Sequence, residues 1–146
     1  TQSVEETLAQ GCVIFVDAGA TFAQTGGTIS TVGEKIVSGI KNYGTFVMSG
    51  GEISNNGKGI YNEGIIQIYD GLITSNRYSG GGAGGGIENK NGTVTMFGGQ
   101  ISSNGSQVGG GIYNNGGEVD IRGGTISDNQ SKQGGGIYNN SQEVNW

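Results

Sequence analysis

The stretch Gly-Ile-Tyr-Asn-Asn-Gly-Gly-Glu-Val-Asp-Ile-Arg-Gly-Gly-Thr-Ile-Ser, at residues 111–127, contains the three motifs that decide the fold. The first is Gly-Ile-x-Asn, the second is a pair of bulky residues two positions apart, and the third is Gly-Gly-x-Ile-Ser. All three recur along the chain in the same order. Repetition of this kind indicates a protein built from stacked copies of one structural unit.

The copies keep a regular spacing. The Gly-Ile isoleucines are Ile40, Ile60, Ile87, Ile112 and Ile137. The bulky pairs are Phe46/Met48, Ile66/Ile68, Val94/Met96, Val119/Ile121 and Val144/Trp146. The isoleucines of the third motif and its variant are Ile29, Ile53, Ile73, Ile101 and Ile126. In the first copy, Phe22 with Gln24 is a degenerate bulky pair, and Val16 is assigned to the Gly-Ile isoleucine position.

Length variation is confined to one part of each copy. The first bulky residue lies seven residues before the third-motif isoleucine in every copy, as in Phe46 and Ile53. The Gly-Ile isoleucine precedes the next bulky residue by six or seven, whereas the remaining step varies from 7 to 14 residues. Each copy therefore has two corners of nearly constant length and one variable corner.

The motifs have the chemistry of short β-strands joined by glycine turns. In Thr93-Val94-Thr95-Met96, the alternation places Val94 and Met96 on one face. Such short strands need many neighbours to be stable, and glycine pairs supply the turns. We predict an all-β parallel β-helix (β-solenoid) of about five coils, each of three short strands and roughly 25 residues.

The same alternation predicts columns of inward side chains, with isoleucine and asparagine of Gly-Ile-x-Asn on one side. One asparagine ladder is expected from Asn42, Asn62, Asn89, Asn114 and Asn139. A second is expected from Asn56, Asn76, Asn104 and Asn129. Because buried amides need hydrogen-bond partners, each amide should bond its equivalents in the neighbouring coils.

The motifs Gly-Gly-x-Ile-Ser-x-Asn and Gly-Gly-Gly-Ile-Tyr-Asn-Asn resemble the right-handed parallel β-helix repeats of bacterial cell-surface and secreted proteins. These include adhesin-like proteins and the polymorphic outer-membrane family, although Ser/Thr-x-Asn replaces the Phe-x-x-Asn motif of that family. The resemblance covers roughly residues 14–146. It implies a right-handed coil and an extracellular or cell-surface location.

Composition excludes several classes of protein. The chain has 33 glycines and no proline, which excludes collagen, and its net charge is −5 with few cations. We therefore expect neither nucleic-acid binding nor membrane insertion. Cys12 lies in an apolar run and is interpreted as a buried small hydrophobe, with a reactive or intermolecularly paired thiol as the alternative.

Catalysis is not expected. The chain has no histidine, and the outward carboxylates Asp120, Glu52 and Glu63 fall in different columns without forming a pair. Arg77 and Arg122 are isolated in the sequence. We predict no catalytic residue, no cofactor and no metal site, with a degenerate polysaccharide-processing β-helix as an alternative.

Two exposed features are candidates for binding. The first is the outward column with Tyr61, Tyr113 and Tyr138, since tyrosine is enriched at interfaces. The second is the long corner 74–86 with Arg77 and Tyr78. The alternatives are tyrosine stacking that only stabilises the solenoid and an inert insertion. A further alternative is an ice-binding hydroxyl column, formed by Ser30, Ser54, Thr74, Ser102 and Ser127.

The two ends carry separate expectations. Residues 1–13 are predicted to form a capping segment with a short helix, and residues 14–146 the repeats. Because the last coil stops in a strand, Val144 and Trp146 mark an end that is either truncated or an assembly interface. The chain begins at Thr1, so we expect a processed product or a piece of a longer protein.

The expected function is therefore that of a non-catalytic, extracellular bacterial surface solenoid, an adhesin-like module that binds or presents. Its expected partner is a glycan or a protein of a host or neighbouring cell. The alternative is a self-associating structural subunit that stacks head to tail into a filament.

Overall fold

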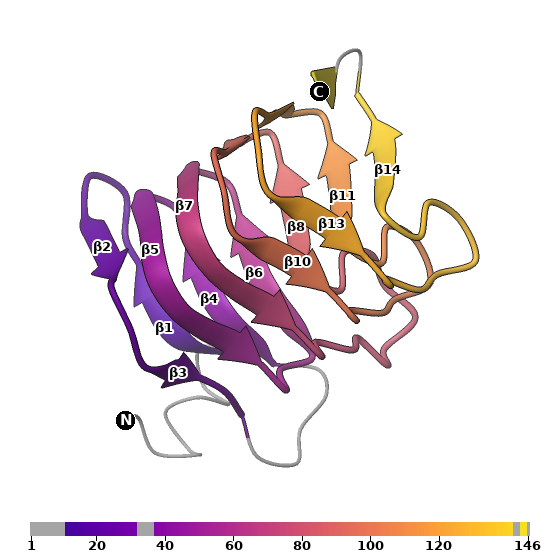
Figure 1. The fold of residues 1–146 in the computed structure, drawn as a ribbon, viewed down its shortest axis with the longest axis horizontal. Coiled ribbons are helices and arrows are strands. Elements are labelled where there is room, and N and C mark those ends of the chain that lie inside the picture. Colours follow the sequence, from indigo (N-terminus) through magenta and orange to yellow (C-terminus); the bar gives the residue numbers. More distant parts are fainter. Residues whose placement is uncertain (1–10, 32–36, 142–143, 146) are drawn as a thin grey trace.

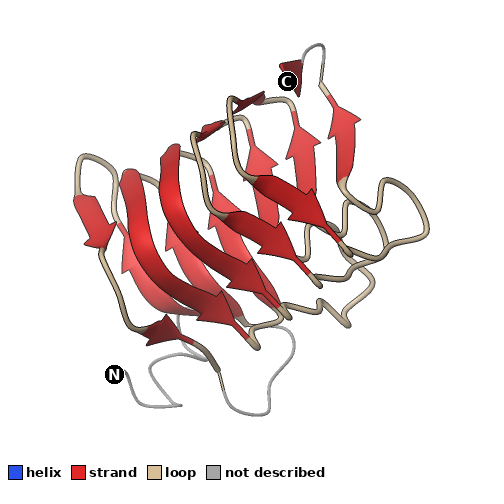
Figure 2. Cartoon of the chain, viewed as in Figure 1, coloured by secondary structure: helices blue, strands red, loops and turns tan. Residues whose placement is uncertain are grey.

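The structure, a computed structural model, describes residues 11–31, 37–141 and 144–145. These ranges contain strands and turns but no helix (Figure 2). No helix that could span a membrane occurs within them. The predicted capping helix falls in residues 1–10 and therefore outside the described residues.

Parallel strands stack into a β-solenoid of about five turns, spaced about 25 residues apart along the chain, as predicted (Figure 1). The first coil contains β1 (Cys12–Val16), β2 (Thr21–Gln24) and β3 (Thr28–Ile29). The second contains β4 (Ser38–Asn42) and β5 (Thr45–Ser54), and the third β6 (Lys58–Asn62) and β7 (Ile65–Thr74). The fourth contains β8 (Ile87–Lys90), β9 (Thr93–Met96) and β10 (Gln100–Ser102). The fifth contains β11 (Ile112–Asn115), β12 (Glu118–Ile121) and β13 (Thr125–Ser127), and β14 (Ile137–Asn140) and β15 (Val144–Asn145) follow.

The strands form two parallel sheets. One sheet has the order β1-β4-β6-β8-β11-β14 and contains the Gly-Ile-x-Asn motifs. The other contains all remaining strands. In this second sheet, β5 and β7 each continue through the corner that separates two strands in coils four and five. Gly51 and Gly71 allow this bend, because their φ angles of 87° and 115° are unfavourable for other residues.

The core is a set of aliphatic and aromatic columns. Ile40, Ile60, Ile87 and Ile112 are fully buried and pair in register, whereas Ile137, in the last strand of this sheet, is half-buried. The bulky pairs also align as predicted, and the degenerate copy of Phe22 and Gln24 pairs with Phe46 and Met48.

Both predicted asparagine ladders are present. In the first, Nδ2 of Asn42 donates to Oδ1 of Asn62 at 2.8 Å, and each later amide donates to the next at 2.8 to 2.9 Å. In the second, Asn56 donates to Asn76 at 3.0 Å, and the series continues to Asn104 and Asn129. Each Nδ2 of the second ladder also donates to an isoleucine carbonyl of the preceding coil. The ladders thus join adjacent coils through buried side chains.

The assignment of Val16 to the isoleucine column was wrong. Ile14 pairs with Ile40, and Val16 pairs with Asn42 at the ladder position. The reason is a longer corner after β1, which closes with a turn in which Ala20 N donates to Asp17 O at 3.0 Å. Because Val16 offers no donor, Oδ1 of Asn42 is buried without a hydrogen-bond partner.

Candidate functional site

Three long corners stack on one another and extend the solenoid sideways. They connect β7 to β8, β10 to β11 and β13 to β14 (Figure 1). Tyr78 N donates to Gly105 O at 3.0 Å, and Ser106 N donates to Gln130 O at 3.2 Å. Bridges also join Arg77 to Gly105 and Gly105 to Gln130. The corners are therefore held in register like the strands that precede them.

The sequence explains this local order. In each corner, a residue with φ near 57° turns the chain, and a ladder asparagine then fastens it to the core. The turning residues are Ser75 (56°), Ser103 (57°) and Asp128 (56°). The buried amides of Asn76 and Asn104 follow directly. Each corner therefore begins at an equivalent position, where a ladder asparagine holds the chain to the core.

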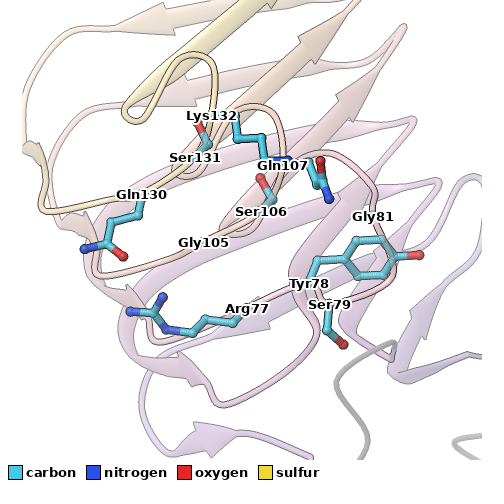
Figure 3. Close-up of a pocket in the computed structure, with 10 residues that line it drawn as sticks. All are labelled: Arg77, Tyr78, Ser79, Gly81, Gly105, Ser106, Gln107, Gln130, Ser131 and Lys132. Carbon is cyan, nitrogen blue, oxygen red and sulfur yellow. The ribbon is translucent and has the colours of Figure 1, made fainter.

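A groove of about 440 Å³ lies over the three corners (Figure 3). Its lining residues are Arg77, Tyr78, Ser79, Gly81, Gly105, Ser106, Gln107, Gln130, Ser131 and Lys132. They supply two cations, two amides, three hydroxymethyl groups and one phenol ring, and no carboxylate. Figure 3 shows the Arg77 and Gln130 side chains pointing to the same side and Tyr78 pointing to the other. The groove is rich in hydrogen-bonding groups of several kinds.

The floor of the groove is shaped by Gly105, which is buried between the two flanking corners. A Cβ at this position would lie 3.1 Å from Nη1 of Arg77 and 3.6 Å from the carbonyl oxygen of Gln130. The guanidinium therefore lies directly beside the glycine. The absence of a side chain at position 105 leaves space in the column between Arg77 and Gln130.

The two groove hydroxyls with described partners are oriented by the backbone. Ser106 Oγ donates to Val108 O at 2.7 Å, and Ser131 Oγ donates to Gln133 O at 2.5 Å. Each hydroxyl has used its proton and retains oxygen lone pairs. Both oxygens are thus acceptors for a ligand hydroxyl.

The predicted outward column is present, and its three tyrosines share it with Lys41 and Glu88, as the sequence spacing predicted. Lys41, Tyr61, Glu88, Tyr113 and Tyr138 occupy successive positions in register. Tyr113 and Tyr138 stack with ring centroids 5.5 Å apart, whereas Glu88 separates them from Tyr61. The stacking agrees with the stabilising interpretation for this pair; a binding role for the column remains a prediction.

Tyr61 instead belongs to a cluster near the N-terminal half of the sheet. Its ring lies 6.2 Å from that of Tyr43, and Lys58 Nζ lies 5.7 Å from the Tyr61 centroid and 4.7 Å from the Tyr78 centroid. Lys58 also forms an ion pair with Glu88. The structure therefore brings Tyr78 close to Tyr61 through a shared lysine, although the two lie in different parts of the coil.

Burial and negative charge both act on this cluster. Burial, followed by the Glu63 carboxylate, raises the pKa of Tyr43 above the ordinary value and that of Tyr61 well above it. Burial also raises the pKa of the Cys12 thiol, which the Lys41 ammonium partly opposes. Cys12 is fully buried, as expected for a small core residue.

A second aromatic stack, which was not predicted from the sequence, lies on the outer surface. Tyr69 and Phe97 are 49% and 38% exposed, and their rings stack with centroids 4.8 Å apart. Arg122 lies over Phe97 at 5.5 Å and forms a 2.8 Å ion pair with Asp120, so Arg122 is not isolated. The signal was present, because all three stacked residues directly follow the second member of a bulky pair.

The lining of the groove was also only partly predicted. Arg77 and Tyr78 were named, but the five polar residues from the next two corners were not: Ser106, Gln107, Gln130, Ser131 and Lys132. Their signal is the equal length of the corners after Ile101 and Ile126, both 11 residues to the next Gly-Ile isoleucine. Two corners of equal length can stack in register. Because the longer corner 74–86 stacks on the first of them, the polar residues of all three corners line one groove.

The remaining candidates are the hydroxyl column, the C-terminal assembly end and a metal site. The hydroxyl column aligns from Ser54 to Ser127, but Ser54 and Ser102 are buried, which argues against an exposed ice-binding array. Val144 lies in β15 and pairs with Val119, and Trp146 lies outside the described residues, so the assembly end stays a prediction. Within the described ranges, no three His, Cys, Asp or Glu side chains gather in a way that could hold a metal ion.

Comparison with protein-family models, with curated proteins and with solved structures finds no match to this chain. The β-solenoid architecture therefore rests on the stacked parallel strands themselves. The resemblance to bacterial surface repeats rests on the short motifs alone.

Proposed function

We propose that this chain is a non-catalytic extracellular binding module, and that it holds a glycan in the groove over the three stacked corners. The observation that carries the proposal is the composition of that groove. It combines the amides of Gln107 and Gln130 with oriented serine hydroxyls and the ring of Tyr78. Polar groups and an aromatic ring on one surface can match the hydroxyls and apolar faces of sugars.

The rigidity of the corners supports this function. Gln107 N donates to Gly82 O at 3.2 Å, and Lys132 N donates to Gln107 O at 3.1 Å. These backbone bonds hold the corners before a ligand arrives. A preorganised surface loses less conformational entropy on binding, which favours affinity for a flexible polymer such as a glycan.

The stacked geometry suits a repetitive ligand. Equivalent residues recur from coil to coil at roughly 4.8 Å, the spacing of neighbouring strands. The groove crosses three coils, and the serine hydroxyls of Ser106 and Ser131 recur at equivalent positions in two of them. The extracellular bacterial location in this proposal is supported by the motif resemblance described above.

A glycan array followed by calorimetric titration of the bound glycans tests the proposal. We expect the Gln107→Ala/Gln130→Ala double variant to weaken binding at least about tenfold, because it removes two exposed amides that would hydrogen-bond the sugar hydroxyls. The matched control is Gln100→Ala, since Gln100 is an exposed glutamine on β10 and does not line the groove.

The outcomes separate cleanly. Loss of glycan binding in Gln107→Ala/Gln130→Ala, together with unchanged glycan binding in Gln100→Ala, supports the proposal. Equal loss in both variants, or no glycan bound by the unaltered chain, would overturn it. Circular dichroism of each variant confirms that the solenoid is intact.

A further inference from the structure

The charge of the groove is opposite to that of the molecule. The whole chain has a net charge of −5, yet the groove lining contains Arg77 and Lys132 and no Asp or Glu. Both cations are exposed. A local positive field in an acidic protein selects ligands of negative charge.

Neither cation is neutralised by a carboxylate of the described chain. The ion pairs among the described residues are Lys58 with Glu88 and Arg122 with Asp120. Arg77 and Lys132 take part in neither. Their charges are therefore available to a ligand, and a guanidinium can bind a carboxylate or sulfate through two hydrogen bonds.

We propose that the ligand of the groove is an acidic glycan, a polymer that carries carboxylate or sulfate groups on its sugar units. This inference rests on the proposed function and specifies its ligand class. Arg77 and Lys132 bind the acidic groups, and the amides and hydroxyls between them bind the sugar hydroxyls.

The separation of the two cations indicates an oligomer rather than a single acidic sugar. Arg77 pairs with Gly105, which pairs with Gln130, so Lys132 lies two coils farther along the solenoid. Two coil steps correspond to roughly 10 Å along the axis. A ligand that contacts both cations must therefore carry two negative groups on different units.

Nucleic acid fits the groove less well than an acidic glycan. Nucleic-acid sites depend on many cations that displace counterions from a dense row of phosphates. The lining of this groove has only two cations, Arg77 and Lys132. We therefore use nucleic acid as a contrasting ligand in the test.

The test is calorimetric titration of the chain with polygalacturonate, which carries carboxylates, and with heparin, which carries sulfates. The neutral counterparts are fully methyl-esterified polygalacturonate and desulfated, N-acetylated, carboxyl-reduced heparin. We expect binding of at least one acidic polymer, at least tenfold weaker binding of its neutral counterpart, and affinity that falls as salt rises from 50 to 500 mM.

Two kinds of variant locate the site. Arg77→Gln/Lys132→Gln should weaken acidic binding at least tenfold and remove most of the salt dependence. The control Lys90→Gln/Arg122→Gln removes the same charge outside the groove and should change affinity less than about threefold.

A third variant blocks the groove without changing its charge. Gly105 does not have a positive φ, so Gly105→Gln is compatible with the backbone and would fill the space between Arg77 and Gln130. Its Cβ would meet mainly the flexible Arg77 side chain. We expect loss of acidic binding with an unchanged melting temperature.

Each result bears on a distinct claim. Equal binding of acidic and neutral polymers through the groove would overturn the acidic class and leave the proposed glycan function standing. If no glycan binds to the chain, both the acidic ligand class and the proposed glycan function are overturned. Equal loss in the groove and control variants, or tighter binding of single-stranded DNA through the same residues, would also overturn the inference. Selective binding of one acidic polymer assigns carboxylate or sulfate as the recognised group.

Discussion

Asparagine and glycine have specific structural tasks at the residue scale. Asn89 is fully buried, and its Nδ2 donates to Asn114 Oδ1 at 2.9 Å while its Oδ1 accepts from Asn62 at 2.8 Å. It also donates to the carbonyls of Gly92 and Glu118. One amide therefore satisfies groups in three coils, and no apolar side chain could replace it without leaving some of them unpaired.

We expect Asn89→Ala to lower the free energy of unfolding by roughly 3 to 5 kcal/mol, because it leaves several buried polar groups unsatisfied. Urea unfolding measures the change. Asn139→Ala is the matched control, since Asn139 ends the same ladder but is exposed, and it should cost less than roughly 1 kcal/mol. Similar losses in the two variants would contradict the ladder account.

The glycines before Ile40, Ile60, Ile87 and Ile112 have a steric reason that the motif alone did not reveal. A Cβ on Gly86 would lie 2.5 Å from the carbonyl oxygen of Gly111 and 3.1 Å from Asn104 Nδ2. The same short approach to the next coil occurs at Gly59 and Gly111. The carbonyl of Gly111 cannot move away, since it accepts from Ile87 N at 2.8 Å.

Gly86→Ala is therefore expected to lower stability by at least about 2 kcal/mol, through displacement of paired backbone. Gly26→Ala should change it by less than about 0.5 kcal/mol, because nothing lies within 4 Å of a Cβ there. Thermal unfolding of both variants measures the difference. An unaltered melting temperature for Gly86→Ala would show that the coils can separate slightly without loss.

Cys12 is predicted to be inert in the folded protein. It is fully buried, and burial raises its pKa, so little reactive thiolate reaches solvent near neutral pH. A disulfide reagent such as Ellman's reagent should label Cys12 only after unfolding in urea. Rapid labelling of the native chain at pH 7.5 would contradict this expectation.

At the scale of elements, the corners separate into paired and protruding parts. Arg77 pairs with Gly105 and Ala83 pairs with Val108, so six residues of one corner span the same register as three of the next. Gly82 O still accepts from Gln107 N at 3.2 Å. The extra residues are therefore 79–81, which form a local bulge at the edge of the groove.

Deletion of residues 79–81 should leave the melting temperature within about 2 °C of the unaltered chain, since no stacked backbone bond is removed and a shorter loop costs less entropy. Deletion of residues 108–110 is the matched control. It removes bonds to both adjacent coils, including Gly109 N to Gln133 O at 2.9 Å, and should lower the melting temperature by more than about 10 °C. Scanning fluorimetry compares the two; an equal loss would show that the bulge is structural.

Across the whole molecule, titration of the tyrosine cluster adds a dependence of stability on pH. The pKa values of Tyr43 and Tyr61 are raised in the folded chain from the ordinary value of 10.0. Above this pH, the unfolded chain releases the phenol protons while the folded chain keeps them. The unfolded state then binds fewer protons, so stability is fully present below about pH 10 and falls as pH rises.

Tyr61→Phe should flatten this alkaline decline, and Glu63→Gln should reduce it partly, because burial and then the Glu63 charge cause the shift. Urea unfolding at pH 8, 10 and 11 gives the slopes, and the values at pH 8 serve as the reference for each variant. The same slope in all three proteins would show that the cluster does not control alkaline stability.

Most of the fold could be predicted because every coil repeats the same phase. Once Ile60 and Ile87 are recognised as equivalent, the residues two positions later must be equivalent too, and the asparagine ladder follows. The prediction failed at Val16, where the corner after β1 is longer and the phase shifts by two residues. Register inferred from spacing is reliable only where corner lengths are conserved.

The coil, its parallel register and its inward columns could be predicted from the amino-acid sequence, because these depend on backbone periodicity and on the burial of apolar and amide side chains. The grouping of outward residues from different corners became visible only in the folded solenoid. Glu88 forms an ion pair with Lys58 of the preceding coil, and Arg77 and Lys132, from two different corners, line one groove. Outward side chains are not constrained by the core, so their partners depend on how separate coils stack in space.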